Sequence, residues 1–164
     1  KEKLQHYEAT ATKNDPLSPY RDAQVGGDAD AGRRIFLNKA EVSCLRCHKV
    51  QGVGGDVGPD LTGVGSRQKR DYLLESIVAP NKQIAKGFET LVLTLKNGKT
   101  RTGVLKSEDA REVRLMTPEG QLLIVPKDAI DERETGKSAM PEDLLKHLSH
   151  SEIRDLVEFL AGLK

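Results

Sequence analysis

The sequence feature that most restricts the chemistry of this chain is the pentapeptide Cys44-Leu45-Arg46-Cys47-His48. Its two cysteines lie three positions apart, and a histidine directly follows the second. Thiols at this spacing can each bond to one vinyl group of a haem, and the histidine can then supply a nitrogen ligand to the iron. The motif therefore predicts covalent haem attachment through Cys44 and Cys47, with His48 as the proximal ligand.

Two other chemistries also use closely spaced cysteines. A thioredoxin-like redox pair requires a βαβ context, which the sequence around this motif does not predict. A zinc site requires two further good ligands, and the sequence contains no other cysteine. Because haem attachment would use both thiols, no disulfide framework is expected.

The composition is that of a chain with a small apolar core. A length of 164 residues suits one ordinary domain, or a small domain with an insertion. The net charge of +1 favours neither nucleic acid nor membrane as a partner. Hydrophobic residues make up 37% and tryptophan is absent, so a buried macrocycle would supply apolar volume that the side chains lack.

The ends of the sequence carry no targeting signal that can be recognised. No apolar run approaches 18 residues, so no membrane span is expected, and no signal peptide is apparent. The chain begins at Lys1 without a methionine. We therefore expect a mature piece or a fragment of a longer protein.

Helical patterns occur on both sides of a central stretch. Residues 28–40 predict a first helix, in which the cost of an internal glycine suggests a close helix crossing at Gly32. Residues 66–79 predict a second helix. A last amphipathic helix is predicted after the capping box formed by Ser149 and Glu152.

The central stretch, 88–134, has a strand pattern. Leucines recur at every second position over 91–95, with Val92, Thr94 and Lys96 between and after them, and Asn97-Gly98 is a strong hairpin signal. The pattern predicts four strands and a short fifth over 129–133, in a small antiparallel sheet curled into a half barrel. Eight basic against nine acidic residues, with no aromatic after the first strand, argue against an RNA-binding barrel.

Three further segments have two interpretations each. Residues 1–26 predict a surface linker, unless apolar side chains anchor it to the domain (Leu4, Tyr7, Leu17, Tyr20). The glycine-rich stretch 52–58 should lack regular structure and fold over a haem edge, since it has no phosphate-loop ending. The basic segment 61–87 is either a solvated face or a docking rim for an acidic redox partner.

Four features occur in a characteristic order: a first helix with Gly32 and Phe36, the motif at 44–48, the loop 58–61, and Met140-Pro141 before a final helix. Together they resemble class I c-type cytochromes. The chain is more closely similar to a haem-binding domain of planctomycetes and verrucomicrobia. That similarity rests on the run GPDLTGVGSR at 58–67, the helix YLLESI ended by proline, the stretch LKNG, and the run Met-Pro-Glu.

This resemblance implies a mainly α cytochrome c fold with an inserted small antiparallel β domain. The boundaries are a linker over 1–26, the cytochrome domain over 27–87 and 135–164, and the β insertion over 88–134. The 92 positions from His48 to Met140 are long for a single-haem domain, and removing the 47 residues of the insertion restores ordinary proportions.

The resemblance also assigns roles within the site. It implies one covalent haem c, with His48 and Met140 as the two axial iron ligands and the carbonyl of Pro59 bound to the other nitrogen of His48. Pro141 keeps Met140 extended. The other ligand candidates are Met116, which has a strand pattern, and His147 and His150, which are expected to be exposed.

The implied function is electron transfer without catalysis. The resemblance implies a periplasmic or otherwise exported domain, whose partner is a redox protein or a fused dehydrogenase-like domain, with no nucleic acid and no membrane span. Two alternatives remain at this point. One is a haem peroxidase or gas sensor with an open sixth position, and the other is an interaction module in which the β insertion is the functional part.

Overall fold

The computed structural model describes residues 15–164, so the expectations for Leu4 and Tyr7 lie outside the described residues. The described chain divides into two compact units. The helical unit contains residues 15–42, 63–82 and 142–164, and the sheet unit contains residues 43–62 and 83–141. Within residues 15–164, no helix is long and apolar enough to cross a membrane.

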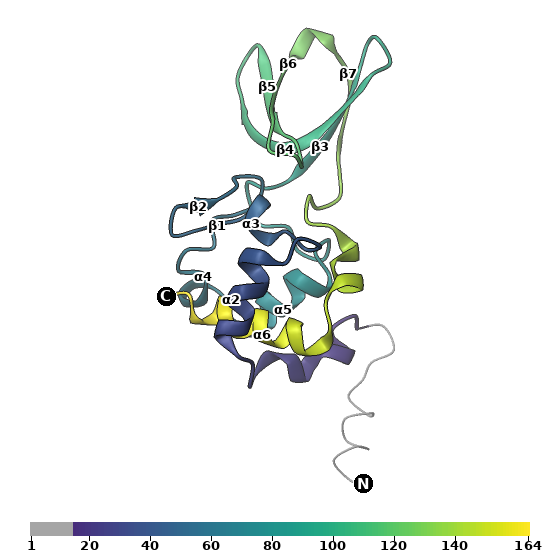
Figure 1. Ribbon diagram of the computed structural model, residues 1–164. Helices are drawn as coiled ribbons and strands as arrows, with labels where there is room; N and C mark the ends of the chain where they lie inside the picture. Colours follow the sequence, from purple (N-terminus) through teal and green to yellow (C-terminus); the bar gives the residue numbers. More distant parts are fainter. Residues whose placement is uncertain (1–14) are drawn as a thin grey trace. The chain divides into compact units, whose positions relative to one another are not determined.

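The helical unit contains four α-helices and two 3-10 helices among its described residues (Figure 1). They are η1 (Ser18–Gln24), α2 (Ala29–Asn38), α4 (Val64–Arg67), α5 (Arg70–Val78), η3 (Glu142–His147) and α6 (His150–Gly162). The predicted first and last helices are both confirmed. Asp28 caps α2 by accepting from the amides of Asp30 and Ala31, and the predicted capping box of Ser149 and Glu152 opens α6.

The predicted close crossing at Gly32 is also confirmed. A Cβ atom on Gly32 would lie 2.0 Å from the carbonyl oxygen of Asp155 and 2.8 Å from the Cβ of Phe159, both on α6. Beside this contact the rings of Phe36 and Phe159 pack with their centroids 5.5 Å apart. Only a glycine lets the backbones of α2 and α6 approach this closely.

The prediction of one continuous second helix over residues 66–79 is wrong. The structure has two helices, α4 and α5, separated by Gln68 and Lys69 in extended conformations. The reason is tertiary. The amide of Gly65 donates to the carbonyl of Leu163, and a Cβ on Gly65 would lie 2.2 Å from the carbonyl oxygen of Ala161. This contact fixes α4 against the end of α6, and the chain changes direction before α5 begins.

The described part of the expected linker is folded rather than extended. Residues Ser18–Gln24 form η1, with Leu17 and Ala23 buried. The ring of Tyr20 stacks on that of His150 with the centroids 5.6 Å apart. In this part of the chain, apolar side chains therefore anchor the segment to the domain, which was the second of the two interpretations of the sequence.

The sheet unit confirms the predicted antiparallel sheet, including its fifth strand. The strands are β3 (Thr90–Leu95), β4 (Thr100–Glu108), β5 (Glu112–Met116), β6 (Leu122–Pro126) and β7 (Ile130–Thr135), in the order β6-β5-β4-β3-β7 (Figure 1). A cluster of alternating apolar residues forms its core (Leu91, Leu93, Val113, Leu115, Val125). The extent of this sheet makes the prediction of a mainly α fold only partly right, since the described chain combines a set of helices with a separate five-stranded antiparallel sheet.

The sheet unit also contains a short helical turn, α3 (Cys44–Cys47), followed by a small hairpin of β1 (Lys49–Val50) and β2 (Val53–Gly54). The prediction that the glycine-rich stretch lacks regular structure is therefore wrong at its start. Gln51 and Gly52 both have positive φ angles, 51° and 80°, which suit a two-residue hairpin turn. From residue 55 to residue 63 the chain forms neither helix nor strand.

Candidate haem-attachment site

The two cysteines lie at the two ends of the single helical turn α3. Residues three apart on a helix share a face, so both sulfur atoms are presented on one side of the turn. Both cysteines are half-buried, and burial raises the pKa of Cys44 to about 11. The pair is therefore positioned for attachment to one edge of a haem.

The glycine-rich loop folds back over this turn through three backbone hydrogen bonds. The amide of Gly55 donates to the carbonyl of Leu45 at 3.0 Å, and the amide of Gly58 donates to that of Cys47 at 2.7 Å. Leu61 donates to Lys49 at 2.8 Å. These bonds fix the path of the chain from the cysteines to Pro59.

The ring of His48 is held by the same loop. Its Nδ1 lies 2.9 Å from the carbonyl oxygen of Pro59. Because a carbonyl can only accept, Nδ1 carries the hydrogen, and the lone pair of a neutral ring is on Nε2. Burial lowers the pKa of His48, while the bond to Pro59 opposes that shift. A neutral imidazole with an available Nε2 is the form that binds iron.

Gly58 lies directly against this ring. A Cβ on Gly58 would lie 2.6 Å from Cε1 and 2.8 Å from Nδ1 of His48. Contacts this short do not occur between real atoms, so the loop can lie here only because residue 58 has no side chain. The sequence signal for this role was the density of glycines after the motif, which did not indicate which glycine meets the ring.

A second contact missed by sequence reasoning is made by Lys106 of β4. Its Nζ donates to the backbone carbonyl of Asp56 and lies 5.0 Å from the centroid of the Phe88 ring. The carboxylate of Asp56 also accepts from Lys49 at 2.6 Å. No sequence pattern indicated that Lys106 would reach the loop, because 50 residues separate it from Asp56.

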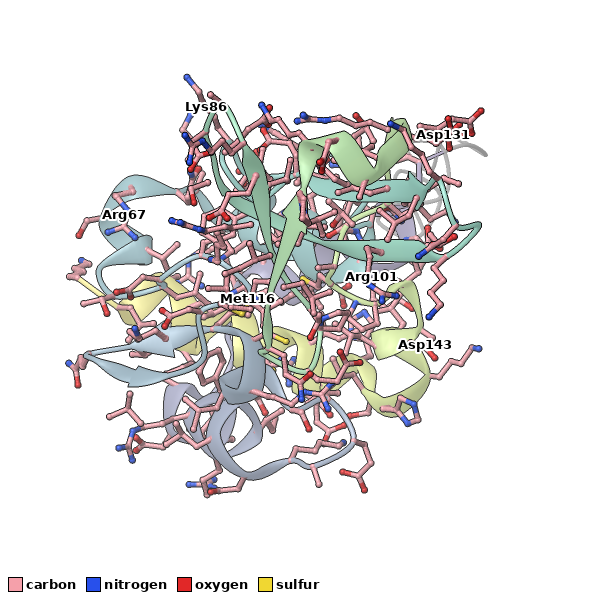
Figure 2. The ribbon with its side chains drawn as sticks, turned by 90° about the horizontal axis from the view of Figure 1, so that it is seen from above. Arg67, Lys86, Arg101, Met116, Asp131 and Asp143 are labelled. Carbon is pink, nitrogen blue, oxygen red and sulfur yellow. The ribbon has the colours of Figure 1, made fainter. Side chains whose placement is uncertain are left out.

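The remaining ligand candidates lie in different elements. Met140 belongs to the irregular segment just before η3, where it is half-buried and its amide donates to Oγ of Ser138 at 3.2 Å. Met116, labelled in Figure 2, lies in β5, where it pairs with Val104 of β4 and Leu122 of β6.

The two histidines near the last helix are exposed, as expected. His147 lies in η3, and His150 begins α6, with its Nε2 3.1 Å from the carbonyl oxygen of Pro19. Among residues 15–164, no group of three His, Cys, Asp or Glu side chains could hold a metal ion.

The paired thiols and the oriented imidazole define the class as that of proteins with covalently bound haem. Comparison with protein families agrees, because the model of the family described as cytochrome c matches residues 29–115, just over half of the chain. The chain belongs to the cytochrome c family. It carries covalently bound haem c, and members of this family act in electron transfer with a redox partner rather than in catalysis.

Two other comparisons add little. No curated protein matches the chain. A solved structure, the 1.55 Å crystal structure of the pleiotropic translational regulator Hfq, is 26% identical over 39% of this chain and 93% of that one. Its TM-score is 0.25, which is too low to establish a shared fold.

Proposed function

We propose that this chain is a single-haem electron-transfer domain in which His48 and Met140 would hold the haem iron. The observation that carries the proposal is the hydrogen bond from Nδ1 of His48 to the carbonyl of Pro59. A metal-binding histidine usually donates its other nitrogen to such an acceptor, which fixes the ring orientation and makes the ligand more basic.

The chain's own residues would supply attachment and orientation. Bound haem supplies an iron that changes between the ferric and ferrous states. Cys44 and Cys47 anchor the group at the turn α3, and Pro59 holds His48 in one tautomer. A thioether ligand from Met140 raises the potential relative to a second histidine.

We also propose that residues 88–134 are an insertion in a cytochrome domain made of 27–87 and 135–164. The two ends of this segment are neighbours, which supports the proposal. Leu91 pairs with Thr135 across β3 and β7, and the amide of Gly136 donates to the carbonyl of Thr90 at 2.8 Å. The cytochrome chain can therefore continue past the sheet with little change in its path.

The wider setting that we propose is an exported or periplasmic one. The domain would form the electron-accepting end of a larger dehydrogenase-like protein of the planctomycete and verrucomicrobial type. The sequence resemblance supports this setting. In the basic segment 61–87, Arg70 pairs with Glu158 at 2.7 Å and Lys82 with Glu75 at 2.5 Å, so these two cations are partly neutralised.

Spectra of the matured protein test the ligand assignment. Expressed in a host that attaches haem c, the polypeptide should carry the mass of one haem that survives acid–acetone extraction. Methionine ligation to ferric haem gives a characteristic weak band at the long-wavelength end of the visible spectrum of the oxidised protein. Met140→Ala should abolish the band and lower the midpoint potential.

Met116→Ala is the matched control and should leave the band and the potential unchanged. If Met116→Ala abolished the band instead, the ligand would come from β5 and the insertion boundaries would be wrong. A parent protein that lacked the band and bound carbon monoxide readily would have an open sixth position. That result would favour the peroxidase or gas-sensor alternative over electron transfer.

A further inference from the structure

Strand β6 lies at one edge of the five-stranded sheet and, within residues 15–164, pairs with β5 alone. The hydrogen bonds at its two ends define which groups face outward. The amide of Thr117 donates to the carbonyl of Gln121, and that of Lys127 donates to Arg111. Since alternate residues of an antiparallel strand face the same neighbour, Leu122 and Ile124 direct their N–H and C=O groups toward the open edge.

The side chains of the same two residues are also exposed. Leu122 is 52% exposed and Ile124 55% exposed, whereas Val125 between Ile124 and the strand end is buried in the core. Natural edge strands normally carry charges, prolines, bulges or a cover that prevents pairing with another chain, and in β6 the one proline is the last residue, Pro126. The segment Leu-Leu-Ile-Val-Pro of β6 carries no charge, and its register with β5 shows no bulge.

The opposite edge shows what such protection looks like in this protein. Strand β7 reads Ile-Asp-Glu-Arg-Glu-Thr, and its four charged residues are all exposed. Figure 2 shows Asp131 of this strand at the margin of the sheet, with its carboxylate pointing outward. A strand that paired with β7 would have to accommodate this row of charges, while a strand that paired with β6 would meet none.

We propose that β6 is a dimerisation edge, at which the sheets of two copies of this chain join through antiparallel β6–β6 pairing about a twofold axis. A second copy fits because an uncharged strand meets itself without like-charge repulsion. The residues that follow and precede the strand are complementary as well. Glu119 lies before β6 and Lys127 after it, so antiparallel pairing brings the acidic end of one strand to the basic end of the other. Lys127 also pairs with Glu108 of its own chain at 2.6 Å, so its charge is partly neutralised before the copies meet.

Pro126 selects the register of this pairing. It has no N–H group, so a register that placed it opposite Leu122 would leave one acceptor in each copy without a donor. Placing Leu122 of one copy opposite Ile124 of the other uses all the outward N–H and C=O groups of both residues. The twofold axis then passes beside Leu123, and four apolar side chains form one cluster on the exposed face.

Sedimentation of the haem-loaded chain over a concentration series tests the association. An edge of five residues buries less than about 1,000 Å², so we expect a reversible dimer with a micromolar dissociation constant. Ile124→Lys should weaken dimerisation at least tenfold without unfolding the chain, because the side chain is exposed. Val25→Lys changes another exposed apolar residue, 64% exposed, and should leave dimerisation unchanged.

Cysteine cross-linking tests the register. Both native sulfurs are bound in thioethers in the loaded protein, so an introduced cysteine is the only free thiol. A mixture of Leu122→Cys and Ile124→Cys proteins should form a mixed disulfide in preference to either homodimer. A monomer at every concentration, or equal weakening by Ile124→Lys and Val25→Lys, would overturn the proposal. Preferential disulfide-linked homodimers of the Ile124→Cys protein would overturn the register.

Discussion

Substituting Gly58 by alanine tests whether the glycine-rich loop positions the iron ligand. The added Cβ would lie 2.6 Å from Cε1 of His48, about 1 Å inside the usual carbon–carbon contact distance. Either the ring or the loop must therefore move. The bond from Nδ1 of His48 to Pro59 is 2.9 Å long, and a displacement of that size takes it past the limit of about 3.5 Å for a useful hydrogen bond.

Two terms set the magnitude of the effect. Overpacking of a tight site costs about 1–3 kcal/mol. Loss of the His48–Pro59 hydrogen bond costs about 1 kcal/mol more. Gly58→Ala should therefore lower the free energy of unfolding by about 2–4 kcal/mol. It should also shift the midpoint potential, because the orientation and basicity of His48 change.

Denaturant unfolding of the haem-loaded protein, followed by its Soret absorption, measures the free energy of unfolding. A redox titration measures the midpoint potential. Gly162→Ala is the control, since nothing lies within 4 Å of a Cβ at that helical position. It should be neutral or stabilising by up to about 1 kcal/mol. If Gly58→Ala unfolded and titrated like the parent, the loop would not position His48.

Three further predictions concern the helical unit. Gly32→Ala should destabilise the protein by about 1–3 kcal/mol, measured by denaturant unfolding, because its Cβ would overlap the carbonyl of Asp155; equal stability would contradict the close crossing. Ser149→Ala removes the cap of α6 and should cost about 1 kcal/mol in the same assay. The hydrogen bond from Arg70 lowers the pKa of Glu158 in the folded protein. The pair therefore stabilises the protein at pH values above the pKa of an unfolded glutamate, about 4.3. This stabilisation is lost as the pH falls and Glu158 becomes protonated. Glu158→Gln should flatten the loss of stability between about pH 5 and 3 in unfolding experiments, and an unchanged pH profile would rule out a contribution from the pair.

The local features of this protein could be predicted from the sequence because each depends on residues that are neighbours in the chain. Haem attachment follows from five consecutive residues, 44–48. The caps of α2 and α6 follow from the residues at their starts, and the strands from period-two patterns joined by short turns. Even the close crossing at Gly32 could be inferred, since a glycine within a helix is costly unless a neighbouring element needs the space.

Apart from the local hairpin of β1 and β2, the features that the sequence did not predict depend on contacts between distant residues. The break between α4 and α5 results from the packing of Gly65 against Ala161, which no helical pattern reveals. The glycine count after the motif predicted a tight loop, but only the folded chain decides that residue 58 meets the His48 ring. The exposure of β6 is likewise a tertiary property. Its continuous apolar run, Leu-Leu-Ile-Val, is compatible with burial on either face, and its place at the edge of the sheet is decided by the order in which the strands pair.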